Sequence, residues 1–287
     1  MSSGELEMRL IKKTVIIPGA SRPIGRAIAR KFASEGANLV LPYFDWPEST
    51  ATMREEFEAR NIPHLALPVD LREPDQVKAL IAAVLDTYGA LHILINNIER
   101  GGMPVVHGSY DLDHNKDQWD LEIATSMKAK WLLFRHCLPL LKQAGKAAVV
   151  NISSIAGIVG RSGPAGLVFN DGYSASNRAI SSFTETWARE GAPEIRVNEL
   201  MLGLIKSRHG ENTRGWTTLT EEEKDTLRRH ILLGRTGTPE EVAEAVFFLA
   251  HQAEYMTGSI LRMDGGYTLG GDRTGPVPPG ILETGAA

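Results

Sequence analysis

Cysteine is almost absent from the chain. Cys137 is the one cysteine among 287 residues, which excludes an internal disulfide and fits a reducing compartment. It lies in the apolar run 131–141, so we expect a core residue, not a nucleophile. The chain also lacks any run of about 18 apolar residues, and residues 1–13 carry no apolar signal region. We therefore expect no membrane span and a cytoplasmic location.

An excess of positive charge is missing too. The 31 Lys and Arg residues stand against 35 Asp and Glu residues, a formal net charge of −4, so the sequence offers no electrostatic reason to bind nucleic acid. We find no metal-ligand spacing among His64, His92, His107, His114 and His136, so we predict no metal site. With 43% hydrophobic and 23% charged residues, the composition is that of an ordinary globular enzyme or binding protein for a small molecule.

Short apolar runs alternate with longer helical patterns. This βαβα alternation predicts an α/β fold, a Rossmann-like doubly wound parallel sheet of about seven strands with helices on both faces. We expect one domain over residues 1–287, with a core at 12–271 and an irregular tail at 272–287. The expected strands are Thr14–Ile17, Asn38–Leu41, Leu65–Val69, Ile93–Ile95, Ala147–Ile152, Ile195–Leu200 and Ser259–Met263. The expected helices are Pro23–Glu35, Thr50–Arg60, Pro74–Tyr88, Lys116–Gln143, Tyr173–Glu190, Glu221–Ile231 and Pro239–Ala250.

A glycine-containing turn, residues 18–25, follows the first expected strand. Gly19 and Gly25 let backbone approach a diphosphate, and the start of the next helix offers free N–H groups and a positive dipole end. Pro23 suits the first helical position because its missing N–H would be unpaired there. Such a turn alone also fits a simple connection, but its place in a βαβ unit favours dinucleotide binding.

Ser154 and Tyr173 are the residues best suited to chemistry on a substrate. Ser154 follows a buried strand, and Tyr173 begins a helix whose i+4 residue on the same face is Asn177. A phenol and an amide would then share one pocket. Taken singly, Ser154 fits a backbone cap and Tyr173 fits packing on the sheet.

Together these features resemble the short-chain dehydrogenase/reductase family over nearly all of residues 12–271. That family has a Thr-Gly-x-x-x-Gly-x-Gly turn, an Asn-Asn-Ala-Gly segment, an Asn-Ser-Tyr-Lys catalytic set and a one-domain Rossmann fold. The counterparts here follow in the same order: Asp70, Asn96-Asn97, Trp119, Asn151-Ile152-Ser153-Ser154, Tyr173, Arg196-Val197-Asn198, Thr257-Gly258-Ser259 and Asp264-Gly265-Gly266.

The resemblance implies a catalytic set that is changed at two of its four positions. In the family, Ser holds the substrate carbonyl, Tyr passes the proton, and Lys four residues later lowers the phenol pKa and binds the ribose. Ser154 and Tyr173 match, but Asn177 replaces the Lys and Ser126 falls where the family has its Asn. Asn177 can still hydrogen-bond a ribose but carries no charge.

The missing charge affects the two reaction directions unequally. A unit charge at about 5 Å, at an effective dielectric of about 20, contributes on the order of 3 kcal/mol, or roughly two pKa units on a phenol. Alcohol oxidation needs the phenolate, whereas carbonyl reduction needs the protonated phenol that an unassisted Tyr has at neutral pH. We therefore expect reduction to be favoured.

Other cations near Tyr173 in sequence are poor substitutes for the missing Lys. Arg178, at i+5, is rotated by about 140° from Tyr173 on a helix of 3.6 residues per turn. Lys128, Lys130, Lys206 and Arg208 could return a charge from other elements, and we interpret all four as solvated surface residues.

The cofactor end is also altered, with Pro18, Pro23, Ile98-Glu99 and Leu202-Gly203 in place of the family's Thr, Gly, Ala-Gly and Pro-Gly. Arg22 resembles the 2′-phosphate clasp of NADP-preferring members, while Asp45 would repel that phosphate, so the resemblance favours NADP(H) weakly over NAD(H). The cofactor-binding residues that it implies are Gly19, Ser21, Arg22, Ile24, Gly25, Tyr43, Asp70, Leu71, Asn97, Tyr173, Asn177, Gly203, Ile205 and Ser207.

Three functions stay open at this stage. The first is an NAD(P)H-dependent reductase acting on a small, partly apolar carbonyl compound, with residues 99–115 or 156–172 covering the pocket. The second is a binding or regulatory protein on an inactive dehydrogenase scaffold, and the third is a lyase that uses Ser154 and Tyr173 without hydride transfer. The family implies a homotetramer or homodimer.

Overall fold

The computed structural model describes residues 9–99, 118–207, 210–211, 214–272 and 274–275. Within these residues, seven strands form one parallel sheet in the order β3-β2-β1-β4-β5-β6-β7. The strands are β1 Thr14–Ile16, β2 Asn38–Tyr43, β3 His64–Pro68, β4 Ile93–Asn96, β5 Ala147–Ser154, β6 Ile195–Leu202 and β7 Ile260–Met263. The doubly wound parallel sheet predicted from the sequence is confirmed.

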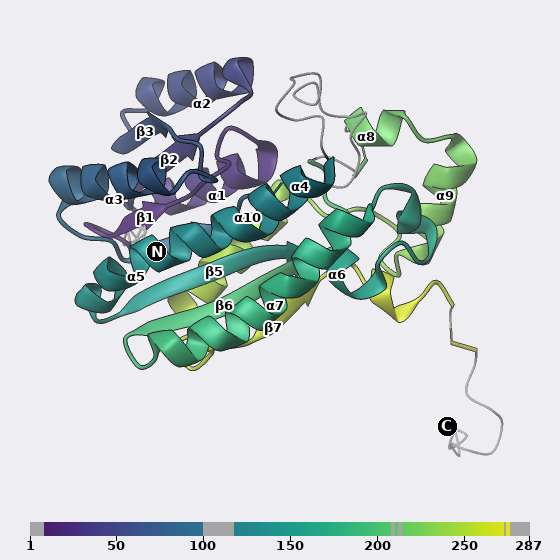
Figure 1. The fold of residues 1–287 in the computed structure, drawn as a ribbon. Coiled ribbons are helices and arrows are strands. Elements are labelled where there is room, and N and C mark those ends of the chain that lie inside the picture. The colour runs from purple at the N-terminus through teal and green to yellow at the C-terminus, as the bar shows by residue number, and fades with distance from the viewer. Residues whose placement is uncertain (1–8, 100–117, 208–209, 212–213, 273, 276–287) are drawn as a thin grey trace, which may run out of the picture.

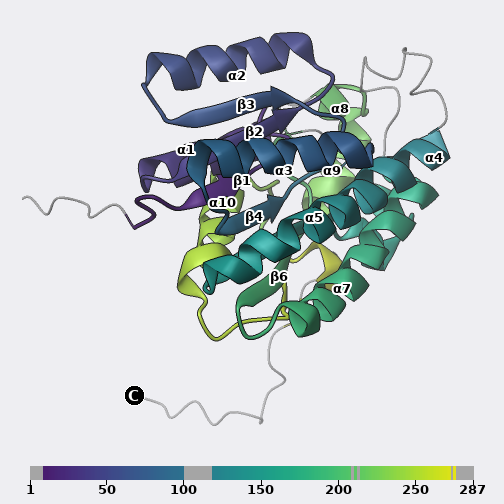
Figure 2. The same cartoon turned by 60° about the vertical axis from the view of Figure 1, so that its left-hand side comes forward.

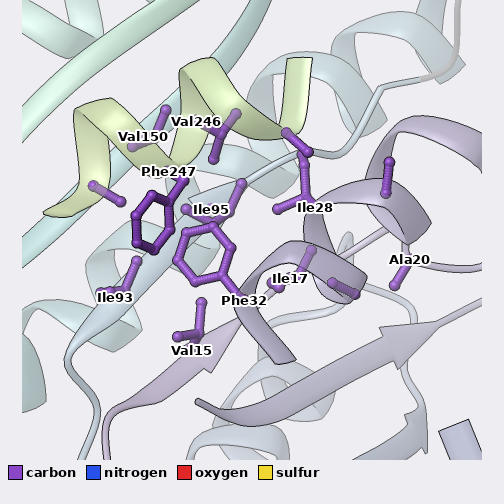
Figure 3. Close-up of a cluster of buried hydrophobic side chains, with 14 of the residues drawn as sticks. Val15, Ile17, Ala20, Ile28, Phe32, Ile93, Ile95, Val150, Val246 and Phe247 are labelled. Atoms are coloured by element: carbon purple, nitrogen blue, oxygen red, sulfur yellow. The ribbon is translucent and has the colours of Figure 1, made fainter. Parts of the chain in front are cut away.

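Helices lie on both faces of this sheet (Figure 1). They are α1 Pro23–Ser34, α2 Pro47–Ala59, α3 Pro74–Tyr88, α4 Gln118–Glu122, α5 Ala129–Ala144, α6 Ala156–Val159, α7 Asp171–Gly191, α8 Arg214–Thr217, α9 Glu221–His230 and α10 Pro239–Phe247. Figure 2 shows α3, α5 and α7 side by side over one face. The other face carries α1 and α10, whose buried residues Phe32 and Phe247 meet edge to face at 5.6 Å (Figure 3).

Two expected helices are not regular throughout. The pattern at 116–143 becomes α4, a π-helical segment η4 at Ile123–Lys128, and α5, while residues 116–117 lie outside the described part of the chain. The pattern at 239–250 becomes α10 and a second π-helical segment, η6 Phe248–Gln252. A π-helical turn closes with a hydrogen bond one residue further along than an α-helical turn, so it contains one extra residue and rotates the side chains after it about the helix axis. Such segments are frequent at functional sites.

The segment 156–172, expected as a loop, contains α6 and the short 3₁₀ helix η5 Pro164–Leu167. Another 3₁₀ helix, η7 Tyr267–Leu269, lies near the end of the described chain, and the Tyr267 hydroxyl accepts a hydrogen bond from the Ala165 N–H at 2.7 Å. Most of the other expected loop at 99–115 lies outside the described residues. The wall near Tyr173 is therefore built from short helices, too short to show a periodic pattern.

Candidate active site

The turn between β1 and α1 requires glycine at two positions. Gly19 has φ +72°, and a Cβ there would lie 2.7 Å from the backbone oxygen of Asn97. A Cβ on Gly25 would lie 2.3 Å from the backbone oxygen of Gly19. Pro23 takes the first position of α1, where its lack of an N–H removes one donor that the helix could not satisfy. The backbone of this turn therefore packs against Asn97 and against itself too closely for a side chain at either glycine.

A cleft lies at the carboxyl ends of β1, β2 and β4. It brings together most of the cofactor-binding residues expected from the sequence: Gly19, Ser21, Arg22, Ile24, Gly25, Tyr43, Asp70, Leu71, Asn97 and Ser207. The order β2-β1-β4 makes this the point where the strand order reverses, the usual ligand site of an open α/β sheet. Helix N–H groups, exposed backbone and polar side chains at one edge fit a dinucleotide.

One end of the cleft is rich in charge and aromatic rings. The Arg22 guanidinium lies 4.4 Å from the ring centre of Trp46 and donates to Ser49 Oγ at 3.3 Å. Arg72 forms a two-pronged ion pair with Asp70, with Nε and Nη2 at 2.8 and 2.6 Å from Oδ1 and Oδ2, and this hydrogen bond raises the pKa of Arg72. Asp45 lines the same end. The cleft thus offers two guanidinium groups and two carboxylates at this end, one of which, Asp70, pairs with Arg72.

A second, smaller pocket opens beside this cleft. Its lining includes Ser154, Tyr173, Gly203 and Ile205, together with the apolar Phe169, Leu202 and Leu204. The two cavities share Ile24, Glu99 and Ser207 in their walls. The structure therefore brings Ser154 and Tyr173 together, next to the cleft that the glycine turn forms.

Local structure positions both hydroxyls. Ser154 ends β5, and its Oγ accepts a hydrogen bond from the Ala156 N–H at 3.1 Å, so the capping interpretation and the pocket position hold together. Tyr173 stands in the first turn of α7, where its N–H donates to the side chain of the N-cap residue Asn170 at 2.7 Å. These contacts fix where the two side chains leave the backbone.

Glu99 is a site residue to which the sequence analysis gave no role. The Tyr173 hydroxyl donates to Glu99 Oε2 at 3.3 Å, although the two residues are 74 positions apart in the chain. The signal was present in the sequence, because an acidic residue three positions after β4 falls at the sheet edge where β5 also ends. The phenol therefore faces a carboxylate.

Asn177 does not line either cavity. It is fully buried, its Nδ2 donates to the backbone oxygen of Tyr173 at 3.0 Å, and its Oδ1 has no partner among the described residues. The expectation that the phenol and this amide share a pocket is wrong, because the short side chain turns back along its own helix. Ser126 lies in η4, is buried as well, and donates to Glu122 Oε2 at 3.1 Å.

Lys130 is also fully buried, so its interpretation as a surface residue is wrong. Its Nζ donates to the backbone oxygen of Ile152 at 2.6 Å. Burial lowers the pKa of Lys130 to about 8, against the opposing pull of Glu99, Glu199 and Glu122. Lys130 lies on the buried side of α5, in helical register with the buried Phe134, Cys137 and Leu141.

The other candidate cations lie elsewhere. Lys128 and Arg178 are exposed, and Lys206 pairs with Glu211 at 3.4 Å. Arg208 lies outside the described residues. The orientation of Arg178 away from Tyr173 agrees with the expectation.

Glu199 is a second buried charge behind the pocket. Its Oε1 accepts hydrogen bonds from Ser153 and from Ser181, the latter at 3.1 Å. Burial raises the pKa of Glu199, while the two hydroxyls and Lys130 act against that shift. A lysine and an acid are thus both held in the interior beneath the site.

Two kinds of feature are absent from the described residues. No group of three or more His, Cys, Asp or Glu residues there is arranged to hold a metal ion. No helix within the described ranges combines the length and apolarity needed to cross a membrane.

Comparisons with known proteins agree with this geometry. A family model described as enoyl-(acyl carrier protein) reductase matches residues 19–268. The 3-oxoacyl-(acyl-carrier-protein) reductase FabG of Staphylococcus aureus is 30% identical over 256 residues, which cover 88% of this chain and 97% of the relative. The enzyme of the same name from Thermotoga maritima is 30% identical over 266 residues, covering 91% of this chain and 100% of the relative.

A solved structure shows the same fold. It is a short-chain dehydrogenase/reductase, titled glucose/ribitol dehydrogenase, from Brucella melitensis, with a TM-score of 0.75 and 24% identity, covering 91% of this chain and 99% of that chain. The family match, the relatives and the seven-stranded sheet agree with one another. The chain belongs to the short-chain dehydrogenase/reductase family of oxidoreductases.

Proposed function

We propose that the protein uses NADPH to reduce a carbonyl group on a small, partly apolar substrate. The observation that carries this proposal is the shared wall of the two cavities, since Ser154 and Tyr173 line the pocket that adjoins the dinucleotide cleft. NADPH, when bound, supplies the hydride that reduces the carbonyl carbon. The residues of the glycine turn, with Tyr43, Asp70, Leu71 and Asn97, would hold it.

The two pocket hydroxyls supply the polar half of the reaction. The Ser154 hydroxyl would donate to the carbonyl oxygen and fix its position, and the Tyr173 hydroxyl would give that oxygen its proton. Neither step needs a cation at position 177, because the phenol is already protonated at neutral pH. The absence of the family's Lys therefore does not prevent these residues from supporting carbonyl reduction.

The preference for NADP(H) over NAD(H) depends on charge. Arg22 and Arg72 line the end of the cleft beyond the glycine turn, and a guanidinium group suits a phosphate. Asp45 opposes this preference, and Asp70 already occupies Arg72. Arg22 is therefore the residue on which selectivity would depend.

The substrate class follows from the pocket wall and the relatives. Phe169, Leu202 and Leu204 make part of the wall apolar. The relatives are named as reductases of 3-oxoacyl groups on a carrier protein. A 3-oxoacyl thioester, which joins a ketone to an apolar chain, is thus the first substrate to test.

The proposal includes an oligomer, a homotetramer or homodimer working in the cytoplasm. Trp131 on α5 is 42% exposed, and a large apolar side chain at the surface fits a contact between subunits. Sedimentation of the purified protein would give the assembly.

The test begins with calorimetric titration of NADPH and NADH, which does not require a substrate. No binding at millimolar cofactor would refute the reductase proposal and leave a binding or regulatory protein. Where cofactor binds, NADPH consumption with 3-oxoacyl thioesters measures the reaction, and Tyr173→Phe should lower it by about 100-fold or more. A Tyr173-dependent reaction that consumes no NADPH would indicate a lyase instead.

A further inference from the structure

The Tyr173 hydroxyl has one polar neighbour that the family motif does not provide. Glu99 follows the Asn96-Asn97 pair and is half-buried in the wall shared by the two cavities. Its Oε2 lies 3.3 Å from the Tyr173 hydroxyl. The carboxylate therefore touches the group that handles the proton and also reaches the solvent-connected cleft.

We propose that Glu99 is the proton-exchange partner of Tyr173, in place of the lysine relay that Asn177 and Ser126 no longer supply. The inference rests on the proposed function for the reaction it serves, but the Glu99–Tyr173 contact itself does not. Glu99 acts through Tyr173, and is therefore a positioning and relay residue that does not contact the carbonyl.

The proton balance is simple in both directions. In reduction, hydride reaches the carbonyl carbon and the Tyr173 proton reaches the carbonyl oxygen. Glu99 then takes up one proton from the bulk solvent, passes it to Tyr173 and returns to the carboxylate. In oxidation, the alcohol proton passes to Tyr173 while Tyr173 gives its own to the Glu99 carboxylate, and hydride leaves for NADP⁺. Glu99 then releases that proton to the bulk solvent. Each direction ends with the phenol protonated.

Charges around Glu99 favour such a role. Lys130, buried on α5, interacts electrostatically with Glu99 more strongly than with Glu199 or Glu122. The Glu99 carboxyl group, which accepts the hydrogen bond from Tyr173, favours the protonated phenol over the phenolate. The family's cation acts on the phenol directly, whereas here the cation acts on the carboxylate that the phenol contacts.

The first experiment needs neither cofactor nor substrate. The near-ultraviolet absorbance of tyrosinate is titrated in the wild type and in Glu99→Gln, with Tyr173→Phe subtracted from each background to isolate Tyr173. Removing the carboxylate should lower the Tyr173 midpoint by about one pH unit or more, because the phenolate no longer faces a like charge. Glu185→Gln removes the same charge from the exposed side of α7 and should leave the midpoint unchanged.

Circular dichroism over the same pH range shows whether each variant stays folded during the titration. Glu99→Asp retains a carboxylate and replaces Glu99→Gln if that variant does not fold. The Tyr173 midpoint in Glu99→Asp should lie above that in Glu99→Gln. If Glu99→Gln does not fold, the comparison is with free tyrosine, and the midpoint should lie above that value. An unchanged midpoint in folded Glu99→Gln overturns the proposal, whether or not the protein proves to be a reductase.

The second experiment compares both directions of the reaction. Glu99→Gln should lower alcohol oxidation by about 100-fold and carbonyl reduction by about tenfold or less, because oxidation needs a proton acceptor and reduction starts from a phenol already protonated. Equal losses in both directions, with cofactor affinity unchanged, would indicate a structural role and overturn the relay. Absence of all turnover in the wild type, with the midpoint shift present, would overturn the proposed function and leave the Glu99–Tyr173 pair standing.

Discussion

The two faces of the sheet differ in the polarity of the side chains that they bury. On the face covered by α1 and α10, the residues around Phe32 and Phe247 form an apolar cluster (Figure 3). On the face covered by α5 and α7, alternate strand residues are apolar at first and turn polar toward the carboxyl ends. Thus Leu94 precedes Asn96, Val149 precedes Asn151 and Ser153, and Val197 precedes Glu199.

The difference separates a face whose strand residues around Phe32 and Phe247 are apolar from a face that also buries ionisable side chains. Apolar burial on the first face contributes stability that depends little on pH. The second face buries Lys130 and Glu199, and removing these ionisable groups from water lowers the free energy of unfolding. The following variants test this contrast.

The largest effect is expected on the apolar face. Phe32→Ala should lower the free energy of unfolding by about 3–5 kcal/mol, since the ring is fully buried against Phe247. Denaturant unfolding measures the loss, and the Tyr173 titration of the folded variant should match the wild type. A loss under about 1 kcal/mol would mean that the contrast between the faces is overstated.

The next effect belongs to Lys130 and depends on pH. Its pKa falls from 10.5 to about 8 on folding, so between those values the unfolded chain binds more protons and wild-type stability rises with pH. Compared with Lys130→Met, the wild type should gain about 3 kcal/mol across that window. Below about pH 8 the cost of the buried charge is present in full.

Thermal or urea unfolding at several pH values measures this gain. Lys128→Met, which removes an exposed lysine two residues earlier, is the matched control and should show no such window. A flat difference between wild type and Lys130→Met would contradict a buried ammonium.

A smaller effect is expected at the cleft. Arg22→Ala should weaken NADPH binding about tenfold while changing NADH binding little, because the guanidinium would meet the extra phosphate of NADPH alone. Calorimetry with both cofactors gives the ratio, and Arg60→Ala, on the exposed end of α2, is the control. Equal weakening of both cofactors would assign Arg22 to general packing against Trp46.

The smallest effect is expected at Asn177. Asn177→Lys should raise the ratio of oxidation to reduction severalfold by returning a cation to the helix of Tyr173. The gain is limited because position 177 is fully buried and Glu99 already contacts the phenol. Initial rates in both directions measure it, and an unchanged ratio would show that another group already fills the role of the lysine.

The sequence predicted the sheet and one wall of the site because both follow from repeating patterns and local motifs. Strand periodicity located all seven strands of the described sheet, and the glycine turn located Gly19 and Gly25. Ser154 and Tyr173 are predicted from their places in the family's order of motifs, because each alone also fits a structural role, and both line one pocket.

The rest of the site depends on contacts and side-chain directions that a local sequence pattern does not determine. Lys130 is misplaced because lysine side chains are usually solvated, although its spacing from the buried Phe134 and Cys137 puts it on the inner side of α5. The i+4 rule misplaces Asn177 because its amide bonds its own backbone. Glu99 was missed because its partner lies on another element, brought close only by the sheet. Residues on short helices such as α6 gave no periodic signal at all.

The strand order also bears on how the protein comes to be active. Because β1 lies next to β4, the glycine turn meets Asn97, and the Glu99–Tyr173 contact joins residues 74 positions apart, so early and late parts of the chain must dock before the site exists. Such distant contacts form late and slowly in folding. Ligand binding at this cleft would therefore report completed folding, and a chain truncated before α7 would keep the glycine turn but lack the pocket wall that carries Tyr173.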